Sequence, residues 1–207
     1  MVGRSNVGKS SFINGLLQRR VARTSNTPGK TRLMNFYVVR GELHQRPLQF
    51  TMVDLPGYGY AKLSQTERAR WGKVLERFLM KRESLCRVVH LVDVRHGMLD
   101  NDLEMHQWLV ENGFKVWLVL TKTDKLSRSQ AAQKILALKK SLIPSVEEVF
   151  SFSTTAAPGQ FSEPSGAGTS LGGCPAGREP FMVRVAEQVW AWTEATPDPL
   201  AVGESSP

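Results

Sequence analysis

Glycine, lysine and serine residues near the start of the chain have the spacing of a phosphate-binding loop. Residues 3–10 read Gly-Arg-Ser-Asn-Val-Gly-Lys-Ser. The two glycines would let backbone N–H groups curl around phosphates, and the helix that follows would add its positive N-terminal end. Lys9 is expected to reach the β- and γ-phosphates, and the Ser10 hydroxyl to bind Mg²⁺. The expected phosphate-contacting residues are Gly3, Arg4, Ser5, Asn6, Val7, Gly8, Lys9 and Ser10.

A carboxylate follows an apolar run at Asp54, and the next residues are Leu55, Pro56 and Gly57. A strand that ends in a carboxylate beside a phosphate-binding loop places that carboxylate near the metal. We therefore expect Asp54 to hold Mg²⁺ through water and the Gly57 N–H to sense the γ-phosphate. The alternative interpretation is a strand followed by an ordinary Pro-Gly turn.

The segment Thr121, Lys122, Thr123 and Asp124 also follows an apolar run. The Asp124 carboxylate can accept two hydrogen bonds, from the guanine N1–H and the 2-amino group, whereas adenine offers no such pair of donors. Lys122 would lie along the base. A solvated loop is the alternative. Together the three segments favour GTP over ATP, which argues against an ATP-dependent kinase.

Several segments resemble the EngB (YihA/YsxC) family within the TrmE-Era-EngA-EngB-like G-domains. The matching segments are residues 3–11, 24–31 (Thr-Ser-Asn-Thr-Pro-Gly-Lys-Thr), 54–61 (Asp-Leu-Pro-Gly-Tyr-Gly-Tyr-Ala), 92–96 and 121–125. The resemblance implies a small GTPase that binds GTP and GDP and is needed for assembly of the large ribosomal subunit. The implied partners are that subunit and its rRNA, bound in the GTP state.

The same resemblance implies further roles for single residues. Thr31 would complete the Mg²⁺ shell when the γ-phosphate is present, and Ser11 would touch the α-phosphate. The set implied around the nucleotide adds Gly29, Lys30, Ser153 and Thr154, the last two supporting the guanine. The metal set is Ser10, Thr31 and Asp54, and the catalytic set is Lys9, Thr31 and Gly57.

Tyr58 stands where many GTPases have a glutamine that orients the attacking water, so intrinsic hydrolysis is expected to be slow. Asn6 suggests K⁺ as a second cofactor, since related GTPases with Asn at this position bind K⁺ there. The alternative is that Asn6 holds the loop by hydrogen bonds. Arg95 and His96 follow a buried strand, where His96 could be catalytic or, as we favour, structural.

The net charge of +8 is concentrated at one end of the chain. Residues 1–40 carry eight Lys and Arg residues and no Asp or Glu. A nucleotide would engage only one or two of these cations, so the surplus predicts a polyanionic partner; a solvated basic face is the alternative. The cations are Arg4, Lys9, Arg19, Arg20, Arg23, Lys30, Arg32 and Arg40.

Alternating strand and helix patterns predict the α/β class: a P-loop G-domain with a doubly wound, mostly parallel sheet of six or seven strands and helices on both faces. The expected strands are 32–40 and 48–54 (a hairpin), 88–94, 116–121 and 149–153. The expected helices are 9–18, 64–82, 101–112, 127–142 and 181–192. One domain would span 1–195, with a flexible Gly/Ser/Pro-rich insertion at 156–179 and a disordered tail at 196–207.

Apolar side chains of the last expected helix, Val185, Val189 and Trp192, should pack on the sheet, and the tryptophans in general are expected in the core. Cys86 and Cys174 are expected to be unpaired thiols. No run approaches the roughly 18 apolar residues of a membrane span, so we expect no membrane contact. We also expect a monomer.

Only Met1 and Val2 precede the loop, where a strand of about five apolar residues is expected. Its loss would leave neighbouring ladder groups unpaired, a defect of several kcal/mol against a stability of ~5–15 kcal/mol. We expect either that the true start lies upstream, which we favour, or that the protein is degenerate. Bacterial cytoplasm and organelle matrix remain alternatives. An RNA-binding assembly module that has lost turnover, and a GTPase of RNA modification, are the competing functions.

Overall fold

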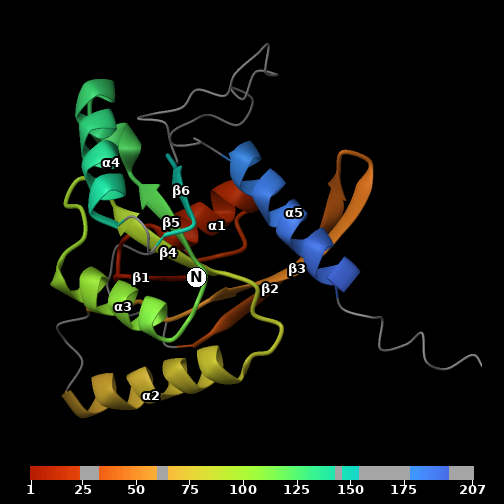
Figure 1. The fold of residues 1–207 in the computed structure, drawn as a ribbon, viewed down its shortest axis with the longest axis horizontal. Helices are drawn as coiled ribbons and strands as arrows, with labels where there is room; N and C mark the ends of the chain where they lie inside the picture. The colour runs from red at the N-terminus through yellow and green to blue at the C-terminus, as the bar shows by residue number, and fades with distance from the viewer. Residues whose placement is uncertain (24–32, 60–64, 143–145, 154–177, 196–207) are drawn as a thin grey trace, which may run out of the picture.

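The computed structural model describes residues 1–23, 33–59, 65–142, 146–153 and 178–195 (Figure 1). Its strands are β1 (Val2–Gly3), β2 (Asn35–Leu43), β3 (Arg46–Asp54), β4 (Val88–Asp93), β5 (Val116–Thr121) and β6 (Glu148–Ser151). Its helices are α1 (Lys9–Leu17), α2 (Gln65–Lys81), α3 (Asp100–Glu111), α4 (Arg128–Leu142) and α5 (Arg178–Ala195), with a 3₁₀ turn η1 (Thr123–Lys125).

The expected elements are present within a few residues of their predicted bounds, and two details differ. The turn η1 was not among the predicted elements. Helix α5 begins at Arg178, so residues 178 and 179 are helical although they were assigned to the insertion. The Arg178 Nε donates a hydrogen bond to the Leu16 carbonyl at 2.7 Å, which anchors the first turn of α5 on the end of α1.

Two sheets replace the single mixed sheet that the sequence suggested. β1, β4, β5 and β6 form a parallel sheet in the order β1-β4-β5-β6, and β2 and β3 form a separate antiparallel hairpin. β1 pairs with β4 through only Val2 and Gly3. Two hydrogen bonds at Met1 connect the sheets. The Met1 nitrogen donates to the Val53 carbonyl (2.7 Å), and the Leu55 N–H donates to the Met1 carbonyl (3.2 Å). These two bonds connect the end of β3 and the residue after it with the residue before β1.

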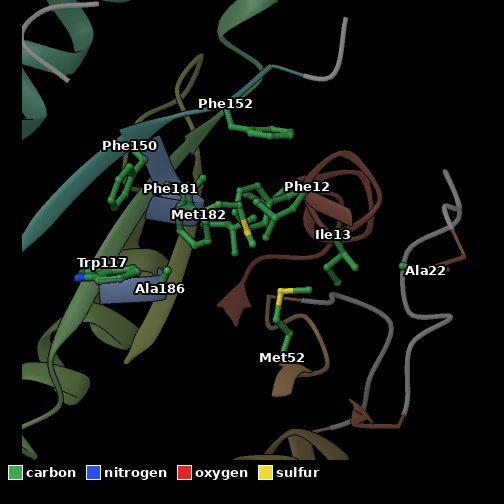
Figure 2. Packing of buried hydrophobic residues seen from close by; sticks show 14 of the residues in the cluster. Phe12, Ile13, Ala22, Met52, Trp117, Phe150, Phe152, Phe181, Met182 and Ala186 are labelled. Carbon is green, nitrogen blue, oxygen red and sulfur yellow. The ribbon is translucent and has the colours of Figure 1, made fainter. Parts of the chain in front are cut away.

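Alternation along the central strands builds a core on each face of the parallel sheet. On β5, Trp117 and Val119 pack in one cluster with side chains from α1 and α5. Figure 2 shows this cluster, in which Phe12 of α1 lies edge-to-face against Phe181 of α5, with ring centroids 5.1 Å apart. Leu118 and Leu120 face the opposite side. Helices therefore cover both faces, which confirms the doubly wound α/β class.

The opposite face is divided between two clusters. Ile135 and Leu142 of α4 pack on the β4 and β5 side chains of one cluster. Leu79 of α2 and Leu109 of α3 pack with Val2 and Leu55 in the other. This second cluster therefore holds Val2 of β1 and Leu55, the residue that follows β3, against α2 and α3.

The tryptophans are divided between core and surface. Trp117 is buried, and Trp108 is half-buried and stacked on Phe114. In α5 the expectation for Trp192 was wrong, since it is 43% exposed. Trp190 packs against the core in its place, and its Nε1–H donates to the Pro47 carbonyl at 2.9 Å. The rotation of α5 that places Val185 and Val189 on the core turns Trp190 toward the hairpin and Trp192 outward.

Candidate functional site

The loop between β1 and α1 has the backbone of a phosphate cradle. Gly8, which precedes α1, has φ of 110°, a conformation that disfavours any residue with a Cβ, and Asn6 is also left-handed. At Gly3 an added Cβ would lie 2.9 Å from the Leu91 carbonyl oxygen, so the loop is pressed against β4. The first N–H groups of α1 are left facing this loop, which is where a helix attracts anions.

Lys9 and Asp54 are buried together beneath this loop. Lys9 is 9% exposed and Asp54 2% exposed. Burial lowers the pKa of Lys9, opposed by the charge of Asp54. Burial also raises the pKa of Asp54, opposed by Lys9. The Lys9 Nζ lies 3.4 Å from the Gly3 carbonyl, a weak contact that leaves the ammonium available to an anion.

One carboxylate oxygen at this place lacks a partner. Oδ1 of Asp54 is buried and accepts no hydrogen bond within the described structure. A buried carboxylate oxygen without a donor is costly unless a cation or an ordered water completes it. The chemistry therefore fits Mg²⁺, which is commonly bound through one or two carboxylates together with waters and phosphates. Of the expected metal set, Ser10 opens α1 beside Lys9, and Thr31 lies outside the described residues.

The segment after Asp54 lies directly against the phosphate loop. The Ser5 N–H donates to the Tyr58 carbonyl at 3.0 Å, and Arg4 and Tyr58 form an isolated parallel bridge. A Cβ on Gly57 would be 2.9 Å from the Ser5 nitrogen and 3.0 Å from its Cα. Only glycine can approach the loop this closely, which places the Gly57 backbone at the position where a terminal phosphate would be sensed.

The expected guanine-contacting residues lie at the carboxyl ends of β5 and β6. Ser153 donates its hydroxyl to Oδ1 of Asp124 at 3.0 Å, and the Lys125 Nζ lies 3.1 Å from Oδ2. Burial opposes ionisation of Asp124, but these bonds outweigh it and lower the pKa. Thr123 donates to the Phe152 carbonyl at 3.3 Å. A charged, oriented carboxylate is what recognition of two guanine donors requires. Thr154 lies outside the described residues.

Lys122 and Thr121 connect this end of the site to the phosphate loop. The Lys122 Nζ donates to the Asn6 carbonyl at 2.7 Å and lies 3.0 Å from Oδ2 of Asp93. The Thr121 hydroxyl, which is buried, donates to the Val7 carbonyl at 2.7 Å. The contact made by Asn6 itself is through its backbone carbonyl, and its exposed side chain has no hydrogen-bond partner within the described structure.

Asp93 is an organising residue that the sequence reasoning did not identify. Its carboxylate binds Lys122 and also the Arg95 guanidinium, whose Nη2 lies 2.8 Å from Oδ2. Burial opposes ionisation of Asp93, but hydrogen bonds from Arg95 and Lys122 lower its pKa to about 2. The signal was available, since Asp93, like Asp54, is a carboxylate at the end of a buried strand. Arg95 is thus structural, while His96 is exposed in the following turn.

A second missed group, beneath the segment after Gly57, involves Asp102 of α3. The Tyr58 hydroxyl donates to Oδ1 of Asp102 at 2.7 Å, and the Arg4 Nε donates to Oδ2 at 2.7 Å. The buried His90 places its Nε2 2.6 Å from the Tyr58 oxygen. Because the Tyr58 proton points to Asp102, the His90 Nε2 must carry a proton and donate.

This network fixes the charge states of its members. Burial, His106 and Arg4 lower the pKa of His90 to about 3, so its imidazole is neutral near pH 7. Burial and the neighbouring Asp102 raise the pKa of Tyr58. Tyr58 is therefore a structural group whose hydroxyl is already engaged by Asp102 and His90.

The described cations of residues 1–40 differ in their surroundings. Lys9 is buried, Arg4 is bound to Asp102, and Arg40 donates to the Gln49 side chain on the hairpin at 3.0 Å. The exposed cations after α1 are Arg19, Arg20 and Arg23. Gly29, Lys30 and Arg32 lie outside the described residues, as do Thr31 and Cys174.

The fold and the site together define a G-domain of the P-loop class. The model of the family described as 50S ribosome-binding GTPase matches residues 1–122. A GTP-binding protein EngB of Clostridioides difficile is 48% identical over 143 residues, covering 69% of this chain and 67% of that protein. Its counterpart in Clostridium kluyveri is 46% identical over 155 residues, covering 74% and 75%. The chain belongs to the EngB family of GTP-binding proteins.

Solved structures confirm the fold. Aquifex aeolicus Era bound to GDP and AlF4⁻ superimposes with a TM-score of 0.67 at 20% identity, covering 91% of this chain and 55% of Era. Era in complex with MgGDPNP and a fragment of 16S ribosomal RNA gives a TM-score of 0.61 at 20% identity, with 82% and 59% covered. Every helix in the described parts of the chain is too short or too polar to cross a bilayer.

Proposed function

We propose that this chain binds GTP and GDP with Mg²⁺, hydrolyses GTP slowly, and acts as a switch on the large ribosomal subunit during its assembly. The main observation in support is that Asp54, Asp124 and the phosphate loop lie at one edge of the fold. The buried carboxylate oxygen of Asp54 supports a metal beside the phosphates, and the oriented carboxylate of Asp124 supports guanine selection. Membership of a ribosome-binding GTPase family supports the ribosomal partner.

Each residue has a distinct role in this proposal. Backbone N–H groups of residues 6–11 surround the α- and β-phosphates, and the buried Lys9 ammonium faces the β- and γ-phosphates. Gly57 donates its N–H to the γ-phosphate, while Lys122 lies along the base and Ser153 keeps Asp124 in place. The residues that would hold Mg²⁺ are Ser10, Thr31 and Asp54, and the metal would neutralise charge on the phosphate oxygens.

Slow turnover follows from the side chains that are available to the attacking water. Tyr58 has its hydroxyl bound to Asp102, so it does not orient water. Stabilisation of developing charge then depends on Lys9, the loop N–H groups and the metal. We also propose that the free Asn6 amide binds K⁺. Equal turnover in KCl and NaCl would remove this part of the proposal.

The test is displacement of fluorescent GDP by GTP, GDP and ATP, followed by phosphate release with and without large ribosomal subunits. GTP and GDP should displace the probe at micromolar concentrations or below, and ATP should not. Removal of Mg²⁺ by EDTA should weaken GTP binding more than GDP binding, since the γ-phosphate adds a metal ligand. Displacement by ATP as readily as by GTP would refute the proposal. Binding without phosphate release in any condition would instead identify an assembly module that has lost turnover.

A further inference from the structure

Helix α2 presents a row of cations to solvent. Arg70, Lys73, Arg77 and Lys81 recur at intervals of three and four residues, and all four side chains are exposed. At about 100° per residue they fall within an arc of about 80°, with about 4.5 to 6 Å of helical rise between neighbours. We name these four residues the α2 stripe. In the described residues none of the four forms an ion pair, unlike Arg4, Arg46, Arg87, Arg95 and Arg184.

The rest of α2 holds the stripe in a fixed orientation. Leu79 is buried in the core, with Leu75 and Phe78 packed around it on the inner side. The Phe78 ring meets Phe36 of β2 edge-to-face at 6.0 Å, and Arg82 lies over both rings at 5.9 Å. Packing on the core and on the hairpin therefore fixes which side of the helix faces solvent.

We propose that the α2 stripe is the surface that binds the phosphate backbone of an RNA strand. This inference rests on the proposed function and locates its RNA contact on α2. A linear row of exposed guanidinium and ammonium groups without acidic partners matches the repeating charge of an RNA backbone. Because contacts to phosphates do not read the bases, this binding should be tolerant of sequence and sensitive to salt.

The position of α2 in the chain relates this surface to the nucleotide. α2 is the first helix after the segment in which Gly57 lies against the phosphate loop. The sequence favoured the cations at the amino end of the chain for this role. Among the described ones, Arg4 and Lys9 are engaged internally. Arg19, Arg20 and Arg23 are exposed but lie after the end of α1 rather than along a helix.

The test compares Lys73→Glu/Arg77→Glu with Arg128→Glu/Lys140→Glu in the full chain. Arg128 and Lys140 are exposed on α4, which lies on the opposite side of the molecule from α2 (Figure 1). Each variant replaces one lysine and one arginine by glutamate, so both variants change the net charge equally. The probe is a fluorescein-labelled 20-nucleotide oligouridine, with a 20-base-pair RNA duplex as the second probe, both followed by anisotropy across a salt series. GDP affinity and circular dichroism show that each variant is folded.

The stripe variant should bind oligouridine at least tenfold more weakly at about 0.1 M salt. When the logarithm of the binding constant is plotted against the logarithm of the salt concentration, its slope should be shallower by about 1.4, which is about 0.7 per lost phosphate contact. The α4 variant should change affinity less than threefold. Equal weakening in both variants, or no binding of either RNA by the unmodified chain, would overturn the proposal. So would a stripe variant that binds RNA normally yet no longer sediments with large subunits, since that result indicates an acidic protein partner. A chain that binds oligouridine but never sediments with subunits would instead contradict the proposed function alone.

Discussion

The two ends of the candidate nucleotide site differ in how completely their polar groups are paired. At the guanine end, Asp124, Lys122 and Asp93 are already held by hydrogen bonds and ion pairs from neighbouring strands. At the γ-phosphate end, Asp54 has a buried oxygen without a partner, and the hairpin that leads to it belongs to a separate sheet. Under the proposed function, the guanine end is therefore preorganised, whereas the phosphate end would be completed by the nucleotide and its metal.

The largest effect is expected at the preorganised end. Asp124→Ala removes two charge-assisted hydrogen bonds and should weaken GDP and GTP binding by about 100-fold or more. Asp124→Asn should instead favour xanthosine nucleotides, because an amide offers one acceptor for N1–H and one donor for the 2-oxo group. Competition with fluorescent GDP measures both. Asp100→Asn, the same charge change at an exposed position on α3, is the control. Unchanged guanine preference in Asp124→Asn would contradict the assignment.

At the other end, Gly57→Ala should separate the two nucleotides. The added Cβ meets the Ser5 backbone, so the segment must shift and the γ-phosphate loses one hydrogen bond. GTP binding should weaken by about tenfold or more while GDP binding changes little. Isothermal titration with GDP and a non-hydrolysable GTP analogue measures the difference. Gly72→Ala on α2, where nothing lies within 4 Å, should leave both affinities unchanged. Equal losses for GDP and GTP in Gly57→Ala would refute γ-phosphate sensing.

The His90 network beneath the phosphate end should make stability depend on pH. The folded state keeps His90 neutral down to about pH 3, whereas the unfolded chain binds the proton near pH 6.5. Its stabilisation is therefore present above pH 6.5 and is lost as the pH falls toward 3, by about 2 kcal/mol between pH 6.5 and 5. The groups facing His90 are Tyr58, Asp102, His106 and Arg4.

Urea unfolding at several pH values measures this slope. His90→Gln keeps an N–H donor near Tyr58 but removes the titration, so its slope in this window should fall by about 1.4 kcal/mol per pH unit. His96→Gln, in an exposed turn, should retain the slope of the unmodified chain. An unaltered slope in His90→Gln would show that other groups cause the acid loss.

The smallest effect is expected where α5 contacts the hairpin. Arg46 lies 4.5 Å over the ring of the half-buried Trp190 and pairs with Glu194, and both charged side chains are exposed. Arg46→Ala should lower the free energy of unfolding by about 0.5–1 kcal/mol, because exposed cation–π contacts and surface ion pairs contribute little. Thermal unfolding measures it against Arg20→Ala, an exposed cation after α1. A loss above about 2 kcal/mol would contradict this estimate and would mean that the hairpin depends strongly on its contact with α5.

The sequence alone determined the features that depend on neighbouring residues. The phosphate loop, the Asp54 and Asp124 motifs and the alternation of elements are local patterns. The α/β class could therefore be predicted, and the motifs suggested a chemistry that stays a prediction. The family followed from the same motifs.

Only the tertiary structure decided which distant groups meet. Contacts such as that between Arg4 and Asp102, or between Lys122 and Asn6, join residues that are far apart in the sequence. No local pattern predicts such pairs. Side-chain rotation about α5, which places Trp190 rather than Trp192 on the hairpin, depends on the whole core. The division into two sheets and the outward direction of the α2 stripe have the same origin, since long-range packing fixes register and facing.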